Sequence, residues 1–459
     1  MDAADLAYAG LARQADLVVG GEVSARELVD ATLARIERID PVLNAYRVVF
    51  AERARAEADS VDAHRRDAGD RPLLGVPVAI KDDCDVAGEV TAWGTDAHGP
   101  AVAADAEVVR RLRRAGAIVI GKTHVPELTI VPFTETPTFG KTRNPWDLER
   151  TPGGSSGGSG AAVAAGLAGA ALGSDGAGSI RIPAGWCGLF GLKPQRGRVP
   201  MAPHVENWHG LSTFGPLTRT VADSARFYDA VSDGGPSFAA AAARPPGRLR
   251  VAVSTNVPAP VTAKVAPEHL GAVESTAELL RALGHEVVER QIDWGSAFLG
   301  VVTRYLRGIH DAAATLPHPE RLSRRTRGYV RLGGLIPPPA LARARAAEAS
   351  DRARINAVFA EGADVVLTPT FVRGPLRIGE YEGRGAQWTL NGTARVVPHL
   401  GPFNATGQPA AAVPAGFHEG LPLSVHLVGR PEDEDTLLSL AAQLEEARPW
   451  AHRRPPHAP

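Results

Sequence analysis

Residues 150–183 read RTPGGSSGGSGAAVAAGLAGAALGSDGAGSIRIP, and this stretch holds two glycine-rich turns that carry serines. Ser155 lies in the first turn and Ser179 in the second. Glycines let the backbone adopt positive φ and come close to a substrate, and successive N–H groups in such turns can bind an anion. A serine placed there could act as a nucleophile with an oxyanion site beside it. Between the turns, the small residues 161–172 predict a helix.

A lysine stands at the end of an apolar run upstream of these turns. Residues 76–80 read VPVAI, which predicts a buried strand that ends next to Lys81. A lysine can deprotonate a serine only if its surroundings lower its pKa from about 10.4 toward neutrality. A shift of three units costs about 4 kcal/mol, which a large apolar fold could absorb. Lys81 is therefore a candidate base for the serines.

Strand and helix patterns alternate along the rest of the chain, which favours an α/β fold. Residues 24–40 form an apolar helical pattern that begins with a capping box of Ser24 and Glu27. Residues 292–356 are rich in arginine and alanine and predict further helices, interrupted by the prolines at 337–339. Other predicted helices cover residues 107–114, 267–283 and 433–447, and other predicted strands cover residues 117–121, 248–254, 285–290, 362–370, 408–417 and 423–427.

Composition limits the class of partner. The chain has 459 residues, with 50 basic and 51 acidic side chains and no long run of one sign, so neither a nucleic-acid surface nor a polybasic membrane patch is expected. Two cysteines are too few for a disulfide framework and fit a reducing cytoplasm. No clustered cysteines and histidines indicate a metal site, and neither a signal peptide nor a membrane span is predicted.

Other interpretations of the serine turns remain open at this point. Most glycine-rich turns are only turns. Residues 154–158 also match the G-x-S-x-G elbow around Ser156, a weak match in a chain with 49 glycines. The first turn could cradle a phosphate, although no G-K-[ST] ending follows it.

Residues 143–200 as a whole strongly resemble the signature of the amidase family. Further matching stretches lie at residues 75–83, 215–225, 364–370 and 404–417. The resemblance implies the amidase signature fold, an α/β fold with a mixed, mostly parallel β-sheet sandwiched between helices. It implies a single domain over residues 1–459, with a catalytic core at residues 60–230. Residues 290–360 would form a helical excursion that shapes the substrate pocket.

The resemblance also implies roles for individual residues. Lys81 matches the general base, Ser155 the proton relay after a cis peptide bond from Gly154, and Ser179 the acylated nucleophile. The backbone N–H groups of the three residues before Ser179 match the oxyanion hole, and three further residues match supporting positions. The oxyanion positions are Gly176, Ala177 and Gly178, and the supporting positions are Ser156, Ser174 and Asp175.

Two positions require comment. The family commonly reads T-D-T-G-G-S where residues 174–179 read SDGAGS, and the methyl group of Ala177 resists positive φ and could narrow the pocket. Arg181 matches an arginine that meets a substrate carboxylate in some relatives, and a structural salt bridge is an equally good interpretation.

The expected function is hydrolysis of a small or aryl/alkyl carboxylic amide without a cofactor or metal. The partner would be a small-molecule amide in the cytoplasm, and a homodimer is left open. One alternative is an ammonia-supplying subunit similar to an amidotransferase A subunit. Another is an inactive binding protein on the same scaffold, and an ester or carbamate substrate also remains open.

Overall fold

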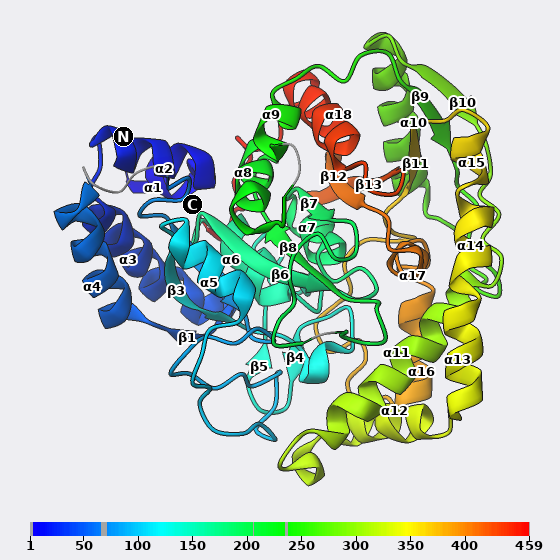
Figure 1. Ribbon diagram of the computed structural model, residues 1–459, viewed down its shortest axis with the longest axis horizontal. Coiled ribbons are helices and arrows are strands. Elements are labelled where there is room, and N and C mark those ends of the chain that lie inside the picture. Colours follow the sequence, from blue (N-terminus) through cyan, green and yellow to red (C-terminus); the bar gives the residue numbers. More distant parts are fainter. Residues whose placement is uncertain (1–2, 66–70, 205, 235–236, 459) are drawn as a thin grey trace.

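The computed structural model describes residues 3–65, 71–204, 206–234 and 237–458. Four helices lie at one side of the molecule (Figure 1). The third of them begins at the predicted capping box, in which Ser24 accepts a hydrogen bond from the Glu27 N–H and the Glu27 side chain accepts one from Ser24, so that prediction is confirmed. The four helices are α1 (Ala3–Tyr8), α2 (Gly10–Gly20), α3 (Ala25–Leu43) and α4 (Ala51–Ala63).

A five-stranded sheet carries the candidate base. Its strand order is β1 (Tyr46–Val49), β3 (Ile118–Thr123), β2 (Pro77–Lys81), β6 (Ala170–Asp175) and β8 (Thr213–Leu217). The strands β3, β2 and β6 are parallel, and the edge strands β1 and β8 are antiparallel to their neighbours. The strand predicted at residues 76–80 is therefore present, and Lys81 is its last residue.

Helices cover both faces of this sheet, as predicted. Val78 and Ile80 of β2 pack in one apolar cluster with residues of α5 (Glu107–Arg114) and α8 (Val221–Val231). Ala79 points to the other face, into a cluster that contains residues of α3 and α6 (Gly157–Ala164). Successive side chains of a strand point to opposite faces, so a strand buried on both sides is apolar at every position.

The helix predicted over residues 161–172 is only half right. The α6 helix ends at Ala164, Gly166 follows with a φ of 67°, and Ala170 begins the strand β6. Alanine and leucine favour helix locally. Pairing of β6 with β2 on one side and with β8 on the other overrides that preference, because the strand conformation depends on packing against its neighbours in the sheet.

A second sheet of six strands continues from the first. Its order is β10 (Glu286–Glu289), β9 (Arg250–Val253), β11 (Val365–Pro369), β13 (Leu421–Gly429), β12 (Ala410–His418) and β7 (Gly191–Lys193). Phe190 and Thr218 exchange backbone hydrogen bonds of 3.0 and 3.1 Å, which join the edges of the two sheets at β7 and β8. A short hairpin of β4 (Glu135–Thr136) and β5 (Gly140–Lys141) stands apart.

The α/β class with mixed sheets is confirmed, but parallel pairs do not predominate. In the six-stranded sheet, β10, β9 and β11 are parallel, whereas β11, β13, β12 and β7 are antiparallel. The β12 and β13 strands are joined by a tight turn, which can connect only antiparallel neighbours.

The segment at residues 292–356 is helical, as predicted, and its helices lie on the side of the molecule opposite α1–α4 (Figure 1). Its helices are α11 (Ala297–Ala314), α12 (Arg324–Gly334), α13 (Pro338–Ala346) and α14 (Glu348–Ile355), with the 3-10 turn Pro319–Arg321. The remaining helices are α7 (Arg181–Cys187), α9 (Phe238–Ala242), α10 (Pro267–Ala282), α15 (Ala357–Ala360), α16 (Ala386–Ala394), α17 (Pro402–Thr406), α18 (Glu434–Ala447) and the 3-10 turn Glu127–Thr129.

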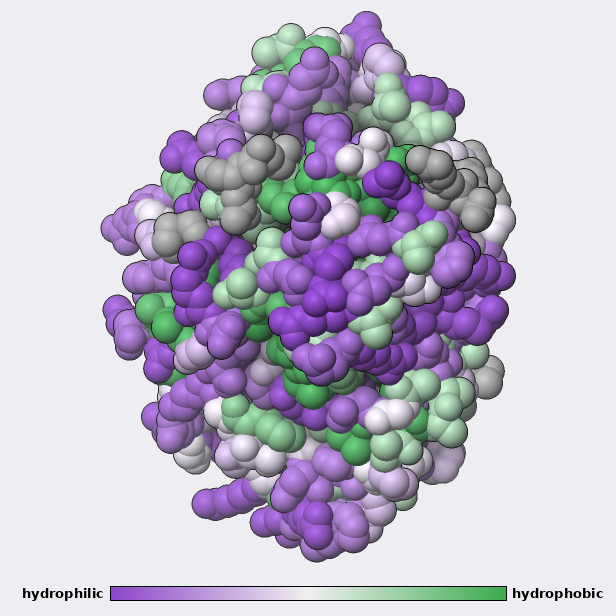
Figure 2. Space-filling model, turned by 90° about the vertical axis from the view of Figure 1, so that its left-hand side faces the viewer, coloured by the Kyte–Doolittle hydropathy of each residue, from purple (hydrophilic) through white to green (hydrophobic). Residues whose placement is uncertain are grey.

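Hydrophilic residues cover most of the face seen in Figure 2, and hydrophobic residues appear there in small groups. None of the helices in the described part of the chain is long and apolar enough to cross a membrane. Cys84 and Cys187 are both buried and are not joined in a disulfide bond.

Candidate active site

Lys81 and Ser174 lie side by side because their strands are parallel neighbours. Ile80 of β2 pairs with Leu172 of β6, so the carboxyl ends of both strands reach the same edge of the sheet. Both serine turns meet at this edge, one before α6 and the other before α7. The edge therefore collects residues that lie up to about a hundred positions apart in the chain.

Lys81 is fully buried among hydroxyl groups. Its Nζ atom lies 2.7 Å from Ser155 Oγ and 2.6 Å from Ser174 Oγ, and its side chain is 0% exposed. Burial lowers the pKa of Lys81 from its ordinary 10.5, and the carboxylate of Asp83 opposes that shift without reversing it. The neutral amine is therefore easier to form than on a surface lysine.

Asp83 is a member of this cluster that the sequence did not single out. Its Oδ2 atom accepts a hydrogen bond from Ser174 Oγ at 2.5 Å and lies 3.2 Å from Lys81 Nζ. Its Oδ1 atom is buried and has no hydrogen-bond partner in the described part of the chain. The clue in the sequence was its position two residues after Lys81, but an acidic residue after a strand is usually solvated.

Ser155 connects the first serine turn to β2, and Ser156 connects it to β6. The Gly154–Ser155 peptide bond is cis, as the resemblance implied. The Ser155 hydroxyl meets Lys81, whereas the Ser156 hydroxyl donates to the Ser174 carbonyl at 3.3 Å and accepts from the Ser174 N–H at 3.4 Å. Both serines are buried. Ser156 therefore fastens the turn to the strand.

Ser179 is partly exposed and lies in the wall of a pocket with Gly154 and Ala177. Its carbonyl accepts a hydrogen bond from the Ser156 N–H at 3.4 Å, which brings the two serine turns together. Among the described residues, the Ser179 hydroxyl forms no hydrogen bond. The contact from Lys81 to Ser155 is thus formed in this structure, and the contact from Ser155 to Ser179 is not.

Backbone N–H groups surround Ser179, but one expected donor is engaged. The Gly178 N–H donates to Asp175 Oδ1 at 2.6 Å, so it is not available to an oxyanion in this geometry. The N–H groups of Gly176, Ala177 and Ser179 donate to no atom of the described residues. Gly178 has a φ of 123°, and a Cβ atom there would lie 2.6 Å from Leu400 Cδ1. Ala177 does not adopt a positive φ, so its methyl group fits without backbone strain.

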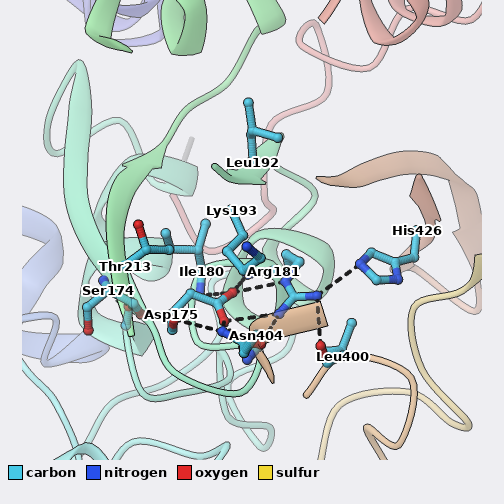
Figure 3. A network of polar contacts seen from close by, with 12 residues as sticks. Ser174, Asp175, Ile180, Arg181, Leu192, Lys193, Thr213, Leu400, Asn404 and His426 are labelled. Carbon is cyan, nitrogen blue, oxygen red and sulfur yellow. Dashed lines mark hydrogen bonds and ion pairs between the residues drawn. The ribbon is translucent and has the colours of Figure 1, made fainter. Parts of the chain in front are cut away.

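Asp175 and Arg181 form a buried ion pair behind the second serine turn (Figure 3). Both side chains are 0% exposed, and Arg181 Nε and Nη2 each lie 3.0 Å from an Asp175 oxygen. Arg181 also donates to Asn404 Oδ1 at 2.6 Å and to the Leu400 carbonyl at 3.1 Å, and it lies 3.0 Å from His426 Nε2.

The side chain of Arg181 thus lies in the interior with protein partners, which favours the structural salt bridge over contact with a substrate carboxylate. Although burial tends to raise the pKa of Asp175, Arg181 and Asn404 hold it well below its ordinary range. Asp175 in turn accepts hydrogen bonds from the N–H groups of Gly178 and Ile180, on either side of Ser179. Asn404 and His426 were not predicted, since nothing in their spacing relates them to Arg181.

The pocket at Ser179 has about 690 Å³ of space, with the open solvent at its mouth included. Its walls come from residues 129–132, from α11, and from residues 390–401, all of which approach the two serine turns. Within the described residues, no group of three histidine, cysteine, aspartate or glutamate side chains could hold a metal ion.

Comparisons with known proteins point to one family. A sequence model of the family described as "Amidase" matches residues 27–438. The chain is 57% identical over 461 residues to a Mycobacterium tuberculosis (strain ATCC 25618 / H37Rv) protein named "Putative amidase AmiB2", with 99% of each chain covered. It is 34% identical over 479 residues to the 6-aminohexanoate-cyclic-dimer hydrolase of Paenarthrobacter ureafaciens, covering 96% of this chain and 95% of the relative. A solved structure of a 6-aminohexanoate cyclic dimer hydrolase with its substrate superposes with a TM-score of 0.91 at 33% identity, over 99% and 100% of the two chains.

Proposed function

The chain belongs to the amidase family and is a hydrolase of amide bonds, and on that premise we propose that it works through an acyl-enzyme on Ser179, with Ser155 as proton relay and Lys81 as general base. The observation that carries the proposal is the fully buried Lys81 amine at 2.7 Å from the Ser155 hydroxyl. A lysine without water around it and with a lowered pKa is suited to accept a proton.

In the proposed reaction, the Ser179 oxygen attacks the amide carbonyl while its proton passes to Ser155, and the Ser155 proton passes to neutral Lys81. The oxyanion is stabilised by the free N–H groups of Gly176, Ala177 and Ser179. When the tetrahedral intermediate collapses, the carbon–nitrogen bond breaks and the protons return along the same path to the leaving amine. Water then attacks the ester by the same route and releases the carboxylic acid.

The relay needs a hydrogen bond between the hydroxyls of Ser155 and Ser179. A serine hydroxyl can rotate between staggered positions at low cost, and catalytic hydrogen bonds often tighten only when substrate is bound. The hydrogen bond between the Ser156 N–H and the Ser179 carbonyl supports this step, since it keeps the two turns adjacent.

We assign the supporting residues as follows. Ser174 holds the Lys81 amine, and Ser156 holds the first serine turn against β6. Asp175 holds the second serine turn through hydrogen bonds from the N–H groups of Gly178 and Ile180. We propose that residues 1–459 act as one amidase domain with its catalytic core at residues 60–230, and that residues 290–360 supply one wall of the substrate pocket. A cytoplasmic location is in keeping with the two unpaired cysteines.

The test is active-site labelling of the folded protein with an alkyl fluorophosphonate, with the labelled residue identified by mass spectrometry. We expect labelling at Ser179, none in Ser179→Ala, and labelling slowed by about 10²- to 10⁴-fold in Lys81→Ala and Ser155→Ala. Ser350→Ala is the control, since Ser350 is an exposed serine on α14. Labelling at another residue, or none in correctly folded protein, would contradict the mechanism.

A panel of amides then measures turnover, and the 6-aminohexanoate cyclic dimer is the first to test because it names a relative. An amidotransferase-type subunit would instead hydrolyse glutamine only after companion subunits are added. The inactive-scaffold alternative was motivated by Gly176 and Ala177, and one of its grounds is weakened because Ala177 does not adopt a positive φ.

A further inference from the structure

The pocket beside Ser179 is lined mainly by apolar side chains. Among the described residues that line it, aliphatic and aromatic side chains form the walls, and no lining residue carries a charge. The largest of these side chains are Trp208, Tyr305, Phe298, Ile130, Ile182 and Leu390. A substrate group that fills such a space exchanges contact with water for contact with apolar surface.

The α11 helix keeps its charged side chains away from this pocket. Val301, Val302 and Tyr305 lie on the pocket side, at the spacing of one helical face. Arg304 faces elsewhere and is held by the His209 carbonyl and by Glu348. Arg307 pairs with Asp311 of the same helix at 2.9 Å. The charges of α11 nearest in sequence to these pocket residues are thus already neutralised by protein partners.

Two of the polar groups in the pocket walls are engaged as well. The Tyr305 hydroxyl donates to the Ile130 carbonyl, and the Thr393 hydroxyl donates to the Thr389 carbonyl at 2.8 Å. The free backbone N–H groups gather instead at Ser179, where the amide carbonyl would lie. Polar recognition is therefore concentrated at the reacting bond, and no charged side chain among the described lining residues could pair with an ionised group.

We propose that this pocket accepts amides whose acyl part is an uncharged, apolar chain or ring, and that it excludes acyl parts bearing a carboxylate or an ammonium group. This inference rests on the proposed function and names its substrate class. The acyl part is the relevant one because it stays attached to Ser179 until water attacks, whereas the amine departs. An ionised group in the pocket would lose its water and gain no partner. Free glutamine, with two charges, is excluded by the same argument.

The experiment compares three 4-nitroanilides of equal chain length. Their acyl parts are hexanoyl, the mono-adipoyl group with a terminal carboxylate, and the 6-aminohexanoyl group with a terminal ammonium. Release of 4-nitroaniline is followed by absorbance, and kcat/KM is measured for each. We expect both charged substrates to be at least about 100-fold poorer than the hexanoyl compound, because each buries an unpaired charge. Values within about 3-fold of one another would overturn the inference.

A variant with a positive charge in the pocket should shift the preference toward a negatively charged acyl part. Val301→Lys places an ammonium in the pocket, so it should lower kcat/KM for the hexanoyl substrate and raise the preference for the adipoyl substrate by about 10-fold or more. The matched control is Leu299→Lys on the same helix, because Leu299 is 53% exposed and does not line the pocket. Folded Val301→Lys protein with an unchanged preference would count against the inference.

A second measurement needs no variant and no turnover. Rates of Ser179 phosphonylation are compared for a neutral alkyl fluorophosphonate and for one with a terminal carboxylate, and the neutral probe should react at least about 100-fold faster. Equal labelling rates would refute the proposed substrate class but would still support Ser179 as the nucleophile. Absence of both labelling and anilide cleavage would instead refute the proposed function, and this inference with it.

Discussion

Replacing Arg181 with methionine should destabilise the protein and slow its reaction with substrates of every charge. Methionine keeps much of the volume but removes the guanidinium that faces Asp175, Asn404 and His426. Asp175 would remain buried with a full charge and without its cation. Since Asp175 holds the N–H groups on both sides of Ser179, its relaxation would also disturb the second serine turn.

The magnitude follows from the burial of the pair. Both partners are 0% exposed, and removing one member of a buried pair typically costs about 3–5 kcal/mol because the other charge is left uncompensated. The cost depends on pH. The pKa of Asp175 is lowered in the folded protein, so its stabilising contribution is present above its ordinary pKa of 3.8 and is lost as pH falls through the folded value. The difference between wild type and variant should therefore be largest near neutrality and shrink in acid.

The assay is urea-induced unfolding followed by tryptophan fluorescence at several pH values, together with the rate of fluorophosphonate labelling. Arg181→Lys is the matched control, because it keeps a positive charge and loses the two-pronged contact, so it should fall between wild type and methionine. An unchanged unfolding midpoint in Arg181→Met, with KM raised only for carboxylate-bearing substrates, would refute the structural role and restore a substrate role.

Three further predictions concern individual groups. Asp83→Asn should move the rising limb of the pH profile of kcat/KM to lower pH, because the carboxylate of Asp83 raises the pKa of Lys81. The control is Asp96→Asn, since Asp96 is exposed. A rising limb at the wild-type pH in Asp83→Asn would show that Asp83 does not act on the base. Asp223→Asn should make stability less dependent on pH. Burial raises the pKa of Asp223 from 3.8 to about 6, so the free energy of unfolding of wild type should fall by about 3 kcal/mol as pH rises through that interval. Urea unfolding at pH 4 and pH 8 measures this difference in both proteins. A difference in Asp223→Asn equal to that of wild type would contradict the prediction. Gly178→Ala should strongly reduce labelling of Ser179, since Gly178 has a φ of 123° and a Cβ atom there would collide with Leu400. Gly197→Ala is the control, because Gly197 also has a positive φ but has open space around it. Equal labelling of the two variants would contradict the steric argument.

Local patterns in the sequence were sufficient for much of the fold. The capping box before α3 and the apolar run that ends at Lys81 act over a few residues, so they could be recognised without knowledge of distant partners. The β6 strand could not be recognised in this way. Its alanine-rich residues favour helix by themselves, and only their place between β2 and β8 makes them a strand.

The candidate site likewise combines features visible in the sequence with contacts that only the fold creates. The glycine turns and the lysine were visible in the chain, and resemblance assigned them roles that remain proposals. Lys81, Ser155 and Ser174 were brought into contact by the parallel pairing of β2 and β6. The partners of Arg181 could not be predicted, because burial decides whether an arginine contacts a substrate or other groups of the protein, and the sequence alone does not give its burial.

The sequence by itself therefore determined the family, the α/β class and the residue types at the reacting edge, since these follow from short-range patterns and a long motif. Only the tertiary structure decided that Arg181 is internal, that Asp83 joins Lys81, and that the pocket is apolar. These properties arise from contacts between segments far apart in the chain, such as residues 129–132, α11 and residues 390–401, and no local periodicity encodes which segments meet.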